Sequence, residues 1–435
     1  MKNSNMINLN TLFLDEMMGN KYPVDVKSWN LPEYERSLIK EIIRCKKDSD
    51  RFTICVEGLP KTGKTTLLKQ LLVHCQNRGK NICYFSFSRK SMQNPRNLEV
   101  ILDFFVNENN QSCICLDDVC YIKGWQDVIH KYFQNTQSSF FLSGTISEHE
   151  NTDRTLHREG INKFVLNPAG FNDYLDARKL KDRKYYLEFP NPLCGNLFRD
   201  FLEGFLIKGS FPELYNIEDR MLINQYIKTS VLEKTIFEDI PVFFSIKELQ
   251  KLFEVFNQIA YHSGDFIYES SFSDITNLSK PTIETFFAHL DEFHLIDRIY
   301  TISNIEKKVK RKKKVYLSSA SLYYNNTANF SSNSLYLTAV NEKLSEFNPV
   351  IYRDNQSHEV DFIVHSDSNI YPFSVKAVDK VFHEELHNLI YFIKKNKLKE
   401  GYFIYKGLYN VMEFNDVKIF FIPLSTFLAS EISFS

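Results

Sequence analysis

The stretch CVEGLPKTGKTTLLKQLL, residues 55–72, decides the fold of the N-terminal part of the chain. A short apolar run leads into a glycine-rich turn, and an apolar helical pattern begins near Lys64. Gly58, Gly63, Lys64 and Thr65 fit the pattern G-x-x-x-x-G-K-[ST] at every fixed position. In this pattern the glycines let backbone N–H groups approach phosphate oxygens, the lysine reaches the β- and γ-phosphates, and the hydroxyl coordinates Mg²⁺. The stretch therefore predicts a phosphate-binding loop between a buried strand and a helix.

The expected ligands of this loop are ATP and Mg²⁺. The helix N-terminus behind the loop adds a dipole that favours phosphate. Lys64 is also predicted to take part in hydrolysis, and Thr65 to hold the metal. The predicted nucleotide-binding residues are Gly58, Leu59, Pro60, Lys61, Thr62, Gly63, Lys64, Thr65 and Thr66.

Length and composition restrict the remaining possibilities. A chain of 435 residues is too long for one compact core and suggests roughly three domains. A net charge of −1 gives no general attraction to nucleic acid or membrane, so such a partner would have to meet a local patch. The eight cysteines do not form paired C-x-x-C motifs, which argues against zinc and favours reduced thiols in a cytoplasmic protein. No apolar run is long enough for a signal peptide or a membrane span, so neither is expected.

Strand and helix patterns alternate between Phe52 and Ser147, which is typical of a parallel sheet covered on both faces. The predicted strands are FTICVEG (52–58), NICYFSFS (81–88), SCICLDDV (112–119) and SSFFLSGT (138–145). The predicted fold class is α/β: a P-loop parallel sheet, then a helical and winged-helix region, then a small α/β domain. The predicted domains are 1–165, 166–240, 241–325 and 326–435.

The predicted winged helix rests on three short helical patterns between residues 245 and 300. The last of them is expected to begin with Ser279 as its cap and Pro281 in its first turn. The helical region before it is expected to break at Gly209 and Pro212. After it, the pattern helix–strand–strand–strand–helix–strand–strand predicts a separate small domain.

Two acids at the end of the third strand are the candidates for metal binding and hydrolysis. Asp117 would hold Mg²⁺ through water, and Asp118 would orient or deprotonate the attacking water. Because Asp is shorter than the Glu more usual in the second place, we expect slow catalysis.

Polar residues further along the chain give weaker signals. Ser143 and Thr145 lie at the end of the fourth predicted strand and would contact the γ-phosphate or the water, although a Ser/Thr-rich turn explains them nearly as well. Arg154 and Arg158 are candidates for supplying positive charge to the transition state, and Arg158 is the one we predict to be catalytic. A surface salt bridge is an equally open interpretation of either arginine.

Five segments in one order carry a family resemblance. VEGLPKTGKTTLL, ICLDDVCYIKGW, FFLSGTIS, FVLNPAGFNDYL and FLIKGSFPEL resemble a family of prokaryotic AAA-like ATPases whose C-terminal half is a domain of unknown function. The resemblance covers nearly the whole chain, from about Glu33 to Leu428. The chain departs from the family at single positions, with Asp117-Asp118-Val119-Cys120 where the family has D-E-I-Q.

This resemblance implies a terminal domain similar to a restriction endonuclease. In such domains two carboxylates and a lysine hold Mg²⁺ and activate water for phosphodiester cleavage. The matching residues are Glu342, Glu359, Asp361 and Lys376, but Ser374 replaces the second-strand acid and is a poor ligand for Mg²⁺. The replacement favours a catalytically silent domain that binds a partner over an ATP-gated nuclease.

A local basic patch keeps DNA open as a partner. The segment Lys307–Lys314, KKVKRKKK, has six Lys and one Arg that would contact phosphates, although a solvated hairpin explains it equally well. The candidate recognition helix, Ser279 to Phe293, carries Glu284 and Asp291, which would repel a DNA backbone. Winged helices also dock proteins, so a protein partner is the alternative.

The sequence as a whole predicts a slow, Mg²⁺-dependent ATPase that acts as a nucleotide-controlled switch for a partner. An ATP-gated nuclease and a DNA-binding scaffold with a degenerate nucleotide site are the alternatives.

Overall fold

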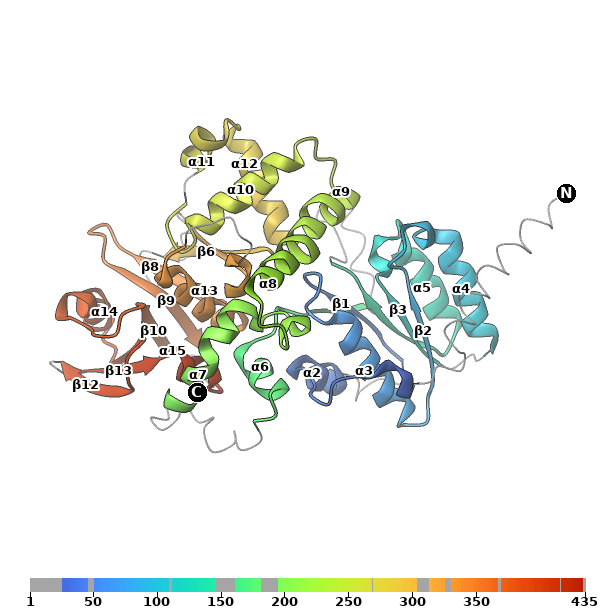
Figure 1. Cartoon of the computed structure of the whole chain (residues 1–435), viewed down its shortest axis with the longest axis horizontal. Coiled ribbons are helices and arrows are strands. Elements are labelled where there is room, and N and C mark those ends of the chain that lie inside the picture. The colour runs from blue at the N-terminus through green and yellow to red at the C-terminus, as the bar shows by residue number, and fades with distance from the viewer. Residues whose placement is uncertain are drawn as a thin grey trace. The chain divides into compact units, whose positions relative to one another are not determined.

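The computed structural model describes residues 26–45, 51–108, 112–145, 161–180, 195–267, 269–302, 313–324, 330–366, 369–414 and 416–432. The chain divides into two compact units (Figure 1). The first comprises Met1–Gly58 with Gly63–Leu166, and the second comprises Leu59–Thr62 with Asn167–Ser435. Across the described ranges, no helix has both the length and the apolar composition needed to cross a bilayer.

The first unit is built on a five-stranded parallel sheet, which confirms the predicted P-loop-type architecture. The strand order is β2-β3-β4-β1-β5, so β4 lies between β1, which precedes the loop, and β3, which ends at Asp117. The fifth strand was not among the predicted ones and pairs in parallel with β1. The strands are β1 (Thr53–Glu57), β2 (Asn81–Ser86), β3 (Ser112–Asp117), β4 (Ser139–Ser143) and β5 (Ile161–Val165).

Helices cover both faces of this sheet, as the continuous apolar strands require. One core contains Ile39 and Ile42 of α2 and Leu68 and Leu71 of α3, while the other contains residues of α4 and α5. The predicted helical lead-in is represented by α2; residues 1–25 and 46–50 lie outside the described part. The helices are α2 (Ser37–Cys45), α3 (Lys64–Gln76), α4 (Pro95–Glu108) and α5 (Trp125–Asn135), with short 3₁₀ turns η1 (Val26–Trp29), η3 (Lys90–Met92) and η4 (Val119–Tyr121).

The second unit begins with a helical region. Its π-helical segment η8 ends at Gly209 and the 3₁₀ turn η9 begins at Pro212, so the predicted break is confirmed. The elements are α6 (Phe171–Ala177), α7 (Gly195–Gly204), η8 (Phe205–Gly209), η9 (Pro212–Leu214), α8 (Arg220–Tyr226), the π-helical η10 (Ile227–Asp239) and α9 (Ile240–Phe243).

Three helices and an antiparallel hairpin follow: α10 (Leu249–Tyr261), α11 (Glu269–Thr276), α12 (Lys280–Glu292), β6 (Ile296–Ile302) and β7 (Lys313–Leu317). The Ser279 hydroxyl accepts a hydrogen bond from the N–H of Thr282 at 3.3 Å, and Pro281 lies in the first turn of α12. This confirms the predicted cap. The order of elements is that of a winged helix, and the assignment itself stays a prediction.

The C-terminal elements confirm the predicted order and add β12 and α15 to it. They are η11 (Ala320–Tyr323), α13 (Ser332–Leu344), η12 (Ser345–Phe347), β8 (Val350–Arg353), β9 (Glu359–Ser366), β10 (Asn369–Val375), α14 (His383–Lys395), β11 (Glu400–Tyr405), β12 (Asn410–Phe414), β13 (Val417–Pro423) and α15 (Leu424–Ala429). The mixed sheet has eight strands in the order β12-β13-β11-β10-β9-β8-β6-β7. Because β6 pairs with β8, the hairpin after α12 belongs to the same sheet. The predicted domain boundaries stay a prediction.

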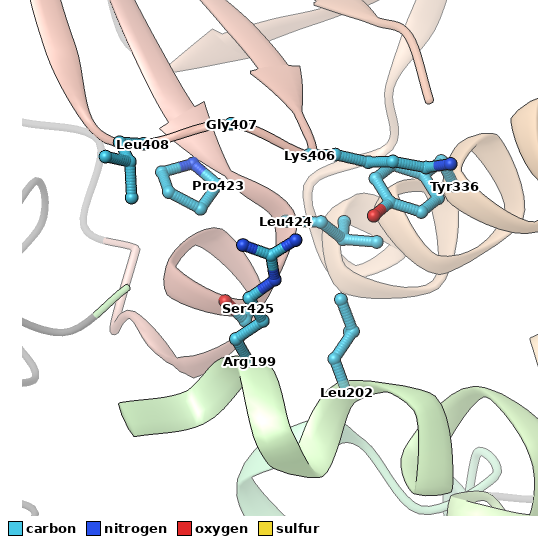
Figure 2. A pocket seen from close by; sticks show the side chains of 9 residues that line it. All are labelled: Arg199, Leu202, Tyr336, Lys406, Gly407, Leu408, Pro423, Leu424 and Ser425. Carbon is cyan, nitrogen blue, oxygen red and sulfur yellow. The ribbon is translucent and has the colours of Figure 1, made fainter. Parts of the chain in front are cut away.

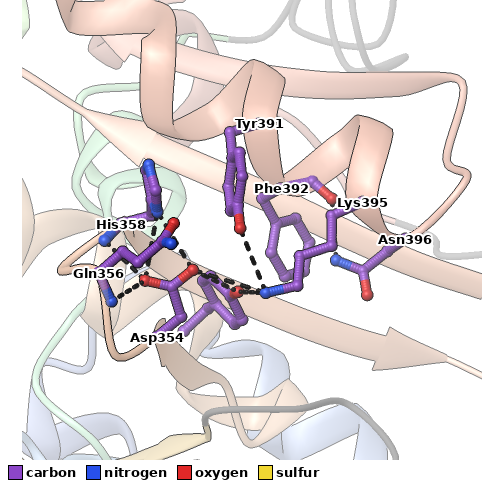
Figure 3. A network of polar contacts seen from close by, with 8 residues as sticks. Asp354, Gln356, His358, Tyr391, Phe392, Lys395 and Asn396 are labelled. Carbon is purple, nitrogen blue, oxygen red and sulfur yellow. Dashed lines mark hydrogen bonds and ion pairs between the residues drawn. The ribbon is translucent and has the colours of Figure 1, made fainter.

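A polar network connects the β8–β9 turn to α14 (Figure 3). One oxygen of the Asp354 carboxylate accepts hydrogen bonds from the N–H groups of Gln356 and His358, at 2.9 and 3.0 Å. The other lies 3.1 Å from Nδ1 of His358 and 3.5 Å from Nζ of Lys395. The His358 ring in turn stacks on Tyr391 with centroids 3.8 Å apart. Burial acts to raise the pKa of Asp354. The hydrogen bonds from His358 and Gln356 outweigh this effect and lower the pKa to about 2.

Asp354→Asn is expected to lower the free energy of unfolding by about 2 kcal/mol at pH 7, because the ionised carboxylate is stabilised in the folded state. The unfolded chain binds the proton of Asp354 more tightly than the folded chain does. The difference in the free energy of unfolding between wild type and variant should therefore have its full value above about pH 4 and disappear as the pH falls towards 2. Chemical denaturation at several pH values measures it. Asp274→Asn, at an exposed position on α11, is the control, and an effect of Asp354→Asn that does not depend on pH would contradict this account.

Candidate nucleotide-binding site

The loop between β1 and α3 has the backbone that the glycine pattern predicts. Gly58 has φ 146°, Gly63 has φ 98° and Lys61 has φ 68°. A Cβ atom at Gly58 would lie 2.5 Å from the carbonyl oxygen of Leu166, so no side chain fits there without movement of the backbone. The loop therefore exists in this form only because its first position is glycine.

The remaining residues of the loop are placed as follows. Helix α3 begins at Lys64, directly after the left-handed Gly63. Lys64 is 8% exposed, and its ammonium group donates a hydrogen bond to the carbonyl oxygen of Gly58 at 2.7 Å, which closes the turn. The Thr62 hydroxyl donates to the carbonyl oxygen of Leu59 at 2.9 Å. Leu59, Pro60 and Thr62 are buried, Lys61 and Thr65 are exposed, and Thr66 is half-buried.

Asp117 is the centre of the site, because three hydroxyl groups donate hydrogen bonds to its carboxylate. The Thr65 hydroxyl donates to Oδ2 at 2.7 Å, which joins the first turn of α3 to the end of β3. The Tyr84 hydroxyl donates to the same oxygen at 3.0 Å, and the Ser143 hydroxyl donates to Oδ1 at 2.5 Å. Since Asp117 is only 3% exposed, these bonds replace the water that its charge would otherwise require.

Asp118 has a left-handed backbone, with φ 59° and ψ 25°. Asp and Asn tolerate this conformation better than longer side chains, because their short polar side chain can bond locally. The left-handed backbone conformation therefore explains why Asp occupies this position, where the family that the chain resembles has Glu. The N–H of Asp118 donates to the Ser143 hydroxyl at 2.9 Å.

The two hydroxyl residues at the end of β4, Ser143 within it and Thr145 just after it, have protein partners. Ser143 bridges Asp117 and the backbone of Asp118, so it positions the acidic pair. The Thr145 hydroxyl lies 2.7 Å from the hydroxyl of Tyr121, and its carbonyl oxygen accepts from the N–H of Gly58 at 3.0 Å. The expected contact of these hydroxyls with a γ-phosphate stays a prediction.

Tyr84 is a site residue that the sequence analysis missed. Its ring lies edge-on to Trp29, at a centroid distance of 5.7 Å, and the ammonium group of Lys69 lies 4.9 Å from its centroid. Burial and the neighbouring Asp117 both raise the pKa of the Tyr84 hydroxyl, so it stays protonated and remains a donor. Only the pairing of β2 with β3 brings Tyr84 to Asp117, and no motif predicts that.

The groups brought together fit a magnesium–triphosphate ligand. The glycine cradle has no room for a Cβ atom at Gly58, a lysine ammonium lies beside it, and a hydroxyl and a carboxylate, the oxygen ligands that Mg²⁺ prefers, are already in contact. Lys64, Thr65, Asp117 and Asp118 thus lie at one edge of the sheet, and their roles in binding and hydrolysis stay a prediction. Arg154 and Arg158 lie outside the described residues.

Two carboxylates of the predicted nuclease-like site, those of Glu359 and Asp361, lie beside lysines. The Glu359 carboxylate accepts from the Lys314 ammonium at 2.5 Å, and Asp361 accepts from the N–H of Val375 at 2.9 Å. Burial raises the pKa of Asp361, whereas the charges of Lys314 and Lys376 lower it.

This donor set does not fit a divalent cation. In the part of the chain that the structure describes, no three His, Cys, Asp or Glu residues are grouped as metal ligands. The buried Ser374 supplies only a hydroxyl where an acid would be needed, and the adjacent positive charges of Lys314 and Lys376 repel a cation.

The last two residues of the basic run have acidic partners. The Lys313 ammonium donates to both carboxylate oxygens of Glu284 on α12, at 2.9 and 2.7 Å, and Lys314 pairs with Glu359. These two lysines are therefore engaged within the fold and not directed at phosphates. The rest of the run, through residue 312, lies outside the described residues.

Comparison with known proteins defines the class of the N-terminal part. Residues 50–175 match the family described as AAA domain, which together with the loop geometry makes this an AAA-like P-loop ATPase domain. Residues 199–333 and 336–427 match two families described only as domains of unknown function, DUF8612 and DUF4143. The predicted resemblance, an AAA-like ATPase with a C-terminal domain of unknown function, is confirmed.

Relatives add little about function. The chain is similar to the uncharacterized protein MJ1637 of Methanocaldococcus jannaschii, at 21% identity over 337 residues, covering 71% of this chain and 70% of that protein. Solved structures with some likeness include AMPPCP-bound DnaA from Aquifex aeolicus, at 14% identity, TM-score 0.27 and coverage of 63% of this chain and 92% of that one. Another is PCH-2 of C. elegans, at 12% identity, TM-score 0.24 and coverage of 62% and 71%. TM-scores this low carry no weight for function.

Gly58→Ala is expected to destabilise the protein by about 2 kcal/mol or more, because the new methyl group meets a backbone oxygen at an unfavourable φ. Gly79→Ala is the matched control: it also has a positive φ, but nothing lies within 4 Å of its Cβ position. Calorimetric unfolding should show the larger loss for Gly58→Ala, and only that variant should bind ATP more weakly. Equal losses, with ATP binding unchanged in both, would contradict the close-packed loop.

Proposed function

We propose that the protein is a slow Mg²⁺-dependent ATPase that acts as a nucleotide-controlled switch for a partner. The observation that carries this proposal is the hydrogen bond of 2.7 Å between the hydroxyl of Thr65 and the carboxylate of Asp117. It places the two predicted metal ligands in contact beside a loop shaped for phosphates. Thr65 and Asp117 would hold Mg²⁺, which when bound neutralises phosphate charge and orients the triphosphate.

The residues of the loop and the acidic pair would divide the work. Lys64 would exchange the Gly58 carbonyl for phosphate oxygens, which an ammonium group binds more strongly. Asp118 would orient or deprotonate the attacking water, held in place by the bond from its backbone to Ser143. Slow turnover follows from the short reach of an aspartate at that position.

The switch rests on bonds that nucleotide must replace. Lys64 bonds Gly58, and Asp117 bonds hydroxyls from α3, β2 and β4, so ligand binding requires at least two of these contacts to exchange. The difference in interaction energy between the two sets of contacts is available to shift a conformational equilibrium. The following two regions, which match domains of unknown function, are the proposed recipients of that shift.

Lys64→Ala is expected to weaken ATP binding about tenfold or more and to reduce turnover to background, because a charge-assisted bond to phosphate is worth roughly 1.5–3 kcal/mol. Isothermal titration with ATP and a phosphate-release assay measure the two effects. Lys80→Ala, an exposed lysine just beyond the other end of α3, is the control and should behave like wild type. A Lys64→Ala protein that binds and hydrolyses ATP normally would refute the proposal.

The class of partner is tested by the same assay with DNA added. Stimulation of turnover by DNA would point to the predicted winged helix and to the basic run before Lys313. Turnover unaffected by DNA would shift the proposal to a protein partner.

The ATP-gated nuclease is the weaker alternative, because Ser374 lacks a carboxylate and Lys314 neutralises Glu359. If the wild type cleaves plasmid DNA in Mg²⁺ or Mn²⁺ and Asp361→Ala does not, the nuclease alternative would be favoured again. A cytoplasmic location stays a prediction from the cysteine pattern.

A further inference from the structure

A cavity beside α7 in the second unit does not bring its charged groups together (Figure 2). Arg199 on α7 and Lys406 after β11 both line it, but Figure 2 shows the guanidinium and the ammonium group directed to different sides. A site that selects a ligand needs polar groups that converge on it. Such convergence is found in the first unit, around the carboxylate of Asp117.

Most acceptor sites of the Asp117 carboxylate are in use, which limits how this residue can hold a cation. A carboxylate offers about four lone-pair sites, two on each oxygen. The hydroxyls of Thr65 and Tyr84 donate to Oδ2, at 2.7 and 3.0 Å, and the Ser143 hydroxyl donates to Oδ1. With these donors from the described part of the chain in place, Oδ1 keeps the free acceptor site, and a water molecule bound to a metal can use it.

The hydroxyls also fix the plane of the carboxylate, because they reach it from different elements. Strands β2 and β4 pair with β3 on its two sides, so Tyr84 and Ser143 hold the carboxylate from opposite neighbours. Ser86 lies opposite Asp117 in the register of β2 and β3, and Tyr84, two residues earlier, is on the same face of β2. Rotation of the carboxylate would therefore break at least one hydrogen bond.

Tyr84 is itself held in place by its ring. The ring of Trp29 meets it edge-on, with centroids 5.7 Å apart. The ammonium group of Lys69 on α3 lies 4.9 Å from the centroid of Tyr84 and 5.3 Å from that of Trp29. Aromatic pairs and cation–π contacts each stabilise such an arrangement by roughly 0.5–1 kcal/mol. The Tyr84 hydroxyl is thus a positioned donor that does not move aside without the loss of these contacts.

We propose that Tyr84 makes the cation site selective for Mg²⁺ over Ca²⁺, an inference that rests on the proposed function of the site. Mg²⁺ keeps several waters and demands near-octahedral geometry, so a fixed carboxylate that accepts from one metal-bound water suits it. Ca²⁺ takes more oxygen ligands and often both oxygens of one carboxylate, which the hydroxyls of Tyr84 and Ser143 prevent. Tyr84 is therefore a positioning residue that acts on the cation through Asp117.

The test compares ATP binding by the full chain in excess Mg²⁺ and in excess Ca²⁺, measured by calorimetry. The readout is the ratio of the two dissociation constants, because a general loosening of the site would weaken both and leave their ratio unchanged. Tyr84→Phe frees an acceptor site on Asp117 and removes one constraint on its rotation. The preference for Mg²⁺ should therefore fall about fivefold or more, which corresponds to about 1 kcal/mol, the value of one hydrogen bond.

Tyr132→Phe is the matched control. The Tyr132 hydroxyl also donates to a carboxylate, that of Asp103, but this bond joins α5 to α4 and not to the phosphate loop. The ratio in this variant should equal that of the wild type. Ser143→Ala removes the donor to Oδ1 and should also lower the preference for Mg²⁺, so the inference stays testable if Tyr84→Phe does not fold. Denaturant unfolding shows whether each variant is folded.

The outcomes separate this inference from the proposed function. Equal affinity of the wild type in Mg²⁺ and Ca²⁺ would overturn the inference alone. So would an unchanged ratio in folded Tyr84→Phe, or in Ser143→Ala if Tyr84→Phe does not fold, and so would the same shift in Tyr132→Phe. A wild type that binds ATP with neither cation would overturn both the inference and the proposed function.

Discussion

The buried carboxylate of Asp117 is the group on which the rest of the nucleotide site depends. An ionised acid that is 3% exposed is stable only if hydrogen bonds replace its hydration, and here hydroxyls of Thr65, Tyr84 and Ser143 do so. Each hydroxyl comes from a different element, so one side chain fixes the phosphate-loop helix and two strands at the same edge of the sheet. The position of Asp118 follows, because its N–H bonds the same serine.

The backbone imposes a second constraint. Gly58 lies against the carbonyl of Leu166, and Asp118 takes a left-handed conformation directly after β3. Both positions restrict the choice of residue for reasons of conformation, independently of any ligand. The slow hydrolysis that we propose would then be a consequence of chain geometry, since the residue best suited to the left-handed turn has a shorter reach towards water.

Features that depend on residues close together in the chain were predicted from the sequence. The glycine spacing of the loop, the apolar strands and the cap at Ser279 could all be inferred, because each depends on neighbours within a few residues. The strand order, which places β4 between β1 and β3, could not be inferred, and neither could the contact of Tyr84 with Asp117. Both depend on how strands pair, and apolar strands of a parallel sheet carry little information about their neighbours.

The charge pairs across the sheet could not be predicted from the sequence either. Lys314 appeared as part of a basic run suited to phosphates, whereas the fold buries it against Glu359, 45 residues further along the chain. A run of like charges predicts a solvated surface only when no strand passes through it, and here β7 begins at Lys313. The same pairing bears on the nuclease-like region, because it places a positive charge among the acids that a metal would need.

The most direct test of the central claim is the coupling between Mg²⁺ and ATP binding, measured by calorimetry with Mg²⁺ or with EDTA. If Asp117 holds the cation, Mg²⁺ should tighten ATP binding about tenfold or more in the wild type, and this enhancement should be lost in Asp117→Asn, whose amide keeps the shape but not the charge. An equal enhancement by Mg²⁺ in the variant, or no ATP binding by the wild type under either condition, would contradict it.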